Sequence, residues 1–147
     1  MPLEPAIEKE VATWLLKATE DLRAAQVDLK AEPPLLNDSL FHCQQACEKA
    51  LKSLLCCLQT PFRKVHDLNE LGNLAMQSFP ELDPSLEKIA HLSGYAVTSR
   101  YPSDEPDPEL DEAHANYQIA SEFVLEIQQD LASAFCHSVE VALLFLP

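Results

Sequence analysis

Arg100 is the residue whose setting in this chain points most directly to chemistry. It stands in the run Ser99-Arg100-Tyr101-Pro102 and is the last Lys or Arg of the 147 residues, while 10 of the 24 Asp and Glu residues follow it. An arginine placed before so many carboxylates serves in one of two ways. It is a counter-ion at a helix end, paired with Asp104 or Glu105, or it is the cation that contacts an anion in a site.

The candidate contacts for a nucleotide or another anion form a small set. They are Lys49, Lys52, His66, Arg100 and Tyr101. Amino and guanidinium groups donate charge-assisted hydrogen bonds to phosphate, and histidine and tyrosine side chains add further donors. A plainer interpretation stays open beside this one. Glu48, Lys49 and Lys52 then form a solvated helix face, and His66 makes a hydrogen bond at the start of a helix.

The five cysteines and the acidic run predict no metal site and no cofactor. Cys43 and Cys47 lie four residues apart on an apolar stripe, where they could be grouped with His42, but no Cys-x-x-Cys pair accompanies them. We expect reduced, buried thiols that act as small hydrophobic side chains. The acidic run 104–112 has no glycine and is interrupted by prolines, which does not suit a calcium-binding loop.

The spacing of apolar residues predicts the elements that must position these side chains. Steps of three and four residues indicate long amphipathic helices over about 5–31 and over 113–134. A second helix, capped by Asn37 or Asp38 and stopped at Thr60-Pro61, is apolar over a wide arc. It should therefore pack against more than one neighbour.

Two shorter helices complete the expected fold. One is capped by Asp67, and the other starts at Asp83 and runs towards Arg100. No stretch alternates between apolar and polar residues with period two. We therefore expect a single domain over 1–147, an all-α, antiparallel up-and-down bundle of four to five helices, with an apolar tail at 138–147 that packs on the bundle or on a second subunit.

The net charge of −14 argues against general binding to nucleic acid, because attraction to phosphate needs clustered Lys and Arg. No apolar run is long enough for a membrane span. The acidic, polar N-terminus does not resemble a secretory signal. We expect a cytoplasmic protein without a membrane partner.

Four segments, in this order, carry a resemblance to a known family. They are Trp14-Leu15-Leu16-Lys17-Ala18, then 41–55 with its paired Gln44-Gln45 and Glu48-Lys49-Ala50-Leu51-Lys52, then His66-Asp67-Leu68, and finally Tyr95 with Ser99-Arg100-Tyr101-Pro102 and its acidic loop. Over residues 10–130 the chain resembles the HEPN family of small helical bundles. The resemblance implies a homodimer, a minimal nucleotidyltransferase as protein partner and, in some members, a nucleotide ligand.

The same resemblance implies that some members are toxins that cleave RNA without a metal. Those members use an Arg and a His with four to six residues between them, and here the matching positions hold Glu105, Pro106 and Asp107. Asp107 also stands where the family's AMP-accepting tyrosine would fall. We therefore expect a non-catalytic, nucleotide-binding accessory subunit. The alternative is a ribonuclease toxin that uses Arg100 with a displaced His114.

Overall fold

Residues 3–96 and 101–135 are described in a computed structural model of the chain. Within these residues the chain forms five α-helices and two short 3-10 helical segments. The α-helices are α1 (Pro5–Lys30), α2 (Leu36–Cys57), α3 (Leu68–Met76), α4 (Asp83–Ile89) and α5 (Leu110–Phe135), and the 3-10 segments are η1 (Pro80–Leu82) and η2 (Ala90–Ala96). The fold is all-α, as the apolar spacing predicts.

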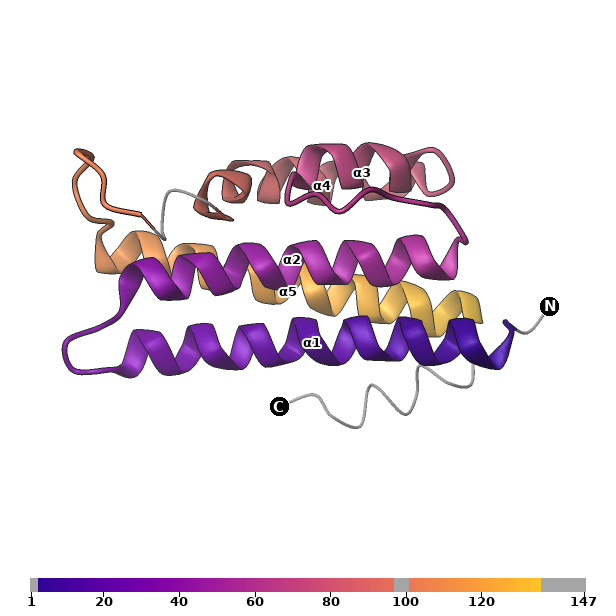
Figure 1. The fold of residues 1–147 in the computed structure, drawn as a ribbon, viewed down its shortest axis with the longest axis horizontal. Helices are drawn as coiled ribbons and strands as arrows, with labels where there is room; N and C mark the ends of the chain where they lie inside the picture. Colours follow the sequence, from indigo (N-terminus) through magenta and orange to yellow (C-terminus); the bar gives the residue numbers. More distant parts are fainter. Residues whose placement is uncertain (1–2, 97–100, 136–147) are drawn as a thin grey trace.

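The three long helices lie side by side, with α1 antiparallel to α2 and α5 (Figure 1). The row formed by α4 and η2 runs back along the bundle, so that α5 starts at the same end as α2. Because α2 contacts α1, α3, η2 and α5, it is the central helix. This confirms an up-and-down bundle in which α2 has more than one packing partner.

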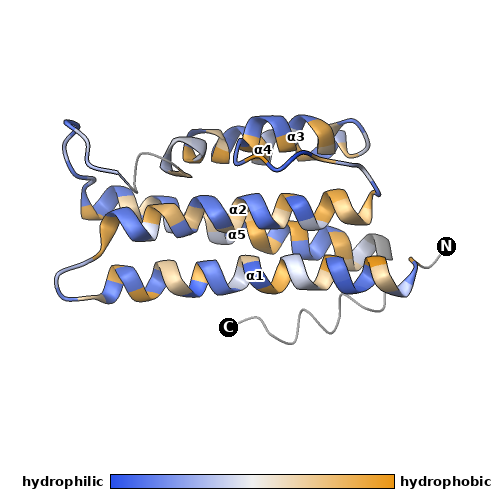
Figure 2. Cartoon of the chain, viewed as in Figure 1, coloured by the Kyte–Doolittle hydropathy of each residue, from blue (hydrophilic) through white to orange (hydrophobic). Residues whose placement is uncertain are grey.

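Apolar residues at three- and four-residue steps make the core. Figure 2 shows that apolar and polar stretches alternate along each long helix. On α1 the buried seam includes Val11, Leu15 and Ala18, and on α5 it includes Val124 and Ile127. Burying each Val, Leu or Ile side chain of these seams contributes roughly 1.5–3 kcal/mol, which accounts for the long helices.

Several predicted boundaries need correction. Helix α2 begins at Leu36 after Leu35, without a side-chain cap, so Asn37 and Asp38 lie inside its first turn instead of capping it. Asp38 still lies in the first turn of α2, where the helix dipole stabilises a carboxylate. The Asp67 cap is confirmed, since its carboxylate accepts a hydrogen bond of 2.9 Å from the backbone N–H of Asn69.

The helix predicted to run from Asp83 towards Arg100 is shorter than expected. It ends at Ile89, and the chain tightens into η2. Arg100 and the apolar tail 138–147 lie outside the described residues. Among the described residues, none of the helices combines the length and the apolar character that crossing a membrane would need.

Candidate functional site

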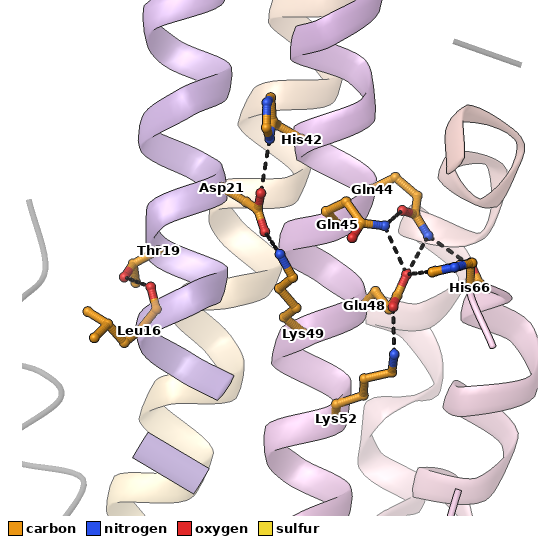
Figure 3. Close-up of polar contacts among 10 residues, drawn as sticks. All are labelled: Leu16, Thr19, Asp21, His42, Gln44, Gln45, Glu48, Lys49, Lys52 and His66. Atoms are coloured by element: carbon orange, nitrogen blue, oxygen red, sulfur yellow. Dashed lines mark hydrogen bonds and ion pairs between the residues drawn. The ribbon is translucent and has the colours of Figure 1, made fainter. Parts of the chain in front are cut away.

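Glu48 is the centre of a polar network on the inner part of α2 (Figure 3). Its side chain is almost fully buried, with 2% of the residue exposed. One carboxylate oxygen accepts a hydrogen bond of 2.6 Å from Lys52 Nζ, and the other lies 3.0 Å from His66 Nδ1. Gln45 and Gln44 donate to that second oxygen over 3.1 and 3.3 Å. A buried carboxylate is stable only with such compensation.

The glutamine pair connects this network to the loop that precedes α3. Gln44 Nε2 donates to the backbone carbonyl of His66 over 2.8 Å, and Gln45 Nε2 donates to Gln44 Oε1 over 2.7 Å. His66 remains largely exposed while its ring contacts Glu48. The network therefore fixes the loop against α2 from both its backbone and its side chain.

Lys52 is buried against two aromatic rings, with 7% of the residue exposed. Its Nζ lies 5.3 Å from the centre of the Trp14 ring and 5.9 Å from that of Phe62. The interpretation of Glu48 and Lys52 as a solvated helix face is therefore wrong. The physical reason is the central position of α2, which places this face beneath α1 and the loop before α3.

Asp21 of α1 organises a second network. It accepts hydrogen bonds from Lys49 Nζ at 2.5 Å and pairs with His42 Nδ1 at 2.9 Å. The hydrogen bond to Asp21 raises the pKa of His42, although burial opposes that shift. Asp28 lies 3.8 Å from the other ring nitrogen, and its own pKa is raised by burial. This network joins α1 to α2 through charge.

The two networks change how the predicted anion contacts should be understood. Lys49 and Lys52 each hold a carboxylate, and the His66 ring contacts one. A phosphate at these residues would have to compete with Asp21 or Glu48 for the same donors. The structure does not bring these three together with Tyr101, which lines a separate cavity.

That cavity is acidic and measures about 640 Å³. We call it the acidic cavity. The titratable residues among those lining it are Tyr95, Tyr101, Glu105, Asp107, Glu109 and Glu112. Tyr95 donates a hydrogen bond of 2.7 Å to Glu112, and burial together with this bond raises the pKa of Tyr95 to about 12. Four carboxylates around one cavity favour a cationic or neutral occupant over an anionic one.

The remaining sequence candidates are dispersed. His114 lies on an exposed face of α5, and Arg100 falls outside the described residues. The predicted burial of the thiols is confirmed for Cys43 and Cys47, and burial raises the pKa of Cys43 to about 12. In the part of the chain that the structure describes, no three His, Cys, Asp or Glu side chains gather as metal ligands would.

Sequence reasoning missed two buried polar residues, Asp21 and Gln128. Asp21 interrupts the apolar side of α1, and a carboxylate beside a buried seam was a signal for a buried partner. Gln128 follows Ile127 on α5 and is fully buried, but a single glutamine at helical spacing carries no comparable signal.

Comparison with known proteins places the geometry in context. A family model described as the HEPN domain matches residues 11–130, which covers most of the chain. No curated protein and no solved structure matches the chain significantly.

Proposed function

The chain belongs to the HEPN domain family, and from this premise we propose that it is a non-catalytic, nucleotide-binding accessory subunit. It forms a homodimer and works with a minimal nucleotidyltransferase. The family membership itself rests on the match over residues 11–130. The non-catalytic part of the role rests on the chemistry of the acidic cavity.

The observation that carries the proposal is the identity of the residues at the histidine positions of the nuclease motif. Counted from Arg100, those positions are Glu105, Pro106 and Asp107, and all three line the acidic cavity. Cleavage of RNA needs a group that transfers a proton near neutral pH and a cation that stabilises the charged transition state. Carboxylates beside a scissile phosphate repel it instead.

Exposed apolar residues near the acidic cavity support a homodimer. Tyr101 lines the cavity and is 69% exposed, while Leu35 and Leu110 are also exposed and lie within two residues of lining positions. When a second copy covers this end of the bundle, these apolar side chains are removed from water, which stabilises the dimer. Light scattering should then give about twice the chain mass of 16.4 kDa.

A nuclease assay tests the absence of catalysis. Purified protein is incubated with single-stranded RNA in the presence of a metal chelator, and we expect no cleavage. The variants Glu105→His and Asp107→His rebuild the motif at spacings that active family members use, and they are the matched gain-of-function controls. Cleavage by the unmodified protein that Arg100→Ala or His114→Ala abolishes would overturn the proposal in favour of the ribonuclease toxin.

Co-expression tests the partner. A minimal nucleotidyltransferase from the same organism should co-purify with the chain through size-exclusion chromatography at a fixed ratio. If the two proteins elute separately at micromolar concentration, the accessory role in this form is wrong.

A further inference from the structure

A groove of about 260 Å³ lies between α1 and α5 and, among the residues described, shares no lining position with the acidic cavity. We call it the α1–α5 groove. Leu22 and Arg23 line it from α1, and Tyr117 and Leu125 line it from α5. The other lining residues are Thr19, Gln26, Ser121, Val124 and Gln128. Since the two helices are antiparallel and pack against each other, the groove runs along both of them (Figure 1).

The groove belongs to an apolar surface that neighbouring side chains leave open to solvent. Leu125 is 45% exposed, although leucine is usually buried. Leu16 is 41% exposed and lies three residues before Thr19. It therefore extends this surface along α1, towards the end of the bundle at which α5 ends (Figure 1). Contiguous exposed apolar surface of this kind marks a place where another segment binds.

Arg23 gives the groove its charge. Among the described lining residues there is no Asp, Glu or Lys, and Arg23 forms no ion pair within the described part of the chain. The groove therefore suits an occupant that is largely apolar and that carries a negative charge.

The apolar tail has this composition and the length to reach the groove. Val139 and residues 141–146 are apolar, and Glu140 is the one charged residue of 138–147. Helix α5 ends at Phe135, and the lining residues from 128 back to 117 lie about 10 to 27 Å from that end at about 1.5 Å per residue. Residues 136–147, which lie outside the described residues, span up to about 40 Å at about 3.3 Å per residue. They can therefore turn back and follow the whole groove.

We infer that residues 139–146 bind in the α1–α5 groove of their own chain, antiparallel to α5. Their apolar side chains cover Leu125 and Leu16 and are themselves removed from water, which stabilises the bound tail. Glu140 complements the charge of Arg23. The short connection after α5 keeps the tail of the same chain at a high effective concentration, which favours it over a second copy. The inference is independent of the proposed function, whose dimer surface lies at the start of α5.

Photochemical cross-linking of the full chain tests this docking. The photoreactive residue p-benzoylphenylalanine takes the place of Phe145, and equal amounts of nitrogen-15-labelled and unlabelled protein are mixed before irradiation. Mass spectrometry should find position 145 joined to peptides from 19–26 or 117–128, with the same isotope in both joined peptides. Labelled peptides joined to unlabelled ones would place the tail on a second copy and overturn the inference. Cross-links that miss both groove segments would also overturn it.

Limited digestion with chymotrypsin, which cuts after large apolar residues, measures how firmly the tail is held. Because Leu125 is exposed, Leu125→Glu should fold normally, as urea unfolding checks, but should release the tail. Cleavage within 143–145 should then be at least about tenfold faster, since it follows the population of unbound tail. The matched control Leu110→Glu changes a leucine that is 43% exposed at the other end of α5, and it should leave the cleavage rate unchanged.

Two results of the digestion would count against the groove. Equal cleavage rates in the unmodified chain and in Leu125→Glu would mean that the groove does not hold the tail. Equal acceleration by Leu125→Glu and Leu110→Glu would mean that the tail is held through the dimer surface instead. If Leu125→Glu does not fold, the cross-linking result decides the inference on its own.

Discussion

Replacing Lys52 with methionine would isolate the buried charge of Glu48. The two side chains are only 9% and 3% exposed, and their charged atoms are 2.6 Å apart. Methionine is similar in length and remains apolar against the Trp14 and Phe62 rings, where a sulfur contact offsets part of the lost cation–π attraction. The main change is therefore a carboxylate left inside the bundle without its cation.

The expected cost follows from the partners that Glu48 keeps. Removing one member of a buried ion pair typically costs about 3–5 kcal/mol. Here the His66 ring and the amides of Gln44 and Gln45 still contact the carboxylate, so we place Lys52→Met near the lower limit, at about 3 kcal/mol. Urea unfolding should show a lower midpoint with an unchanged slope.

Two further variants make the measurement decisive. Arg63→Met removes a cation whose pairing with Glu70 is exposed, and it should cost less than about 1 kcal/mol. Adding Glu48→Gln to Lys52→Met removes the stranded charge and should recover much of the lost stability. The reasoning is refuted if Lys52→Met costs no more than Arg63→Met, or if the double variant is as unstable as Lys52→Met.

Three other outcomes follow from the same contacts. The pKa of His42 is raised from 6.5, mainly by its hydrogen bond to Asp21. The protonated His42 therefore stabilises the fold fully below pH 6.5, and this stabilisation is lost as the pH rises through the raised pKa. Unfolding midpoints should fall across that pH range, and Asp21→Asn should make the fall smaller. Ser53→Ala removes the bond from the buried hydroxyl to the Val11 carbonyl across α1 and α2, and urea unfolding should show a loss of about 1 kcal/mol. In a Cys136→Ser variant, the four remaining thiols should react with an alkylating reagent only slowly until the protein is unfolded, as counted by mass spectrometry.

The long helices could be predicted because the spacing of their apolar residues is a local property of the sequence. The seam that includes Val11, Leu15 and Ala18 repeats the period of a helix, and the same residues are the ones that the bundle buries. The ends were less predictable, since the start of α2 depends on backbone geometry at Leu35 and not on the polar residues that follow it.

The polar networks could not be predicted from the pattern alone. Glu48 and Lys52 are four residues apart on one helix, which is also the spacing of an exposed surface pair. Their burial depends on a loop whose His66 contacts Glu48 from 18 residues away in the sequence. Gln128 is hidden for the same reason, because only the tertiary packing of α5 reveals that its amide is buried without a hydrogen-bond partner.

The acidic cavity weighs against cleavage of RNA through its charge. Glu105 and Asp107 stand at histidine positions of the nuclease motif, and together with Glu109 and Glu112 they place four carboxylates around one cavity. Like charges repel, so this cavity disfavours a scissile phosphate. On this argument both the acidic cavity and the net charge of −14 weigh against cleavage of RNA.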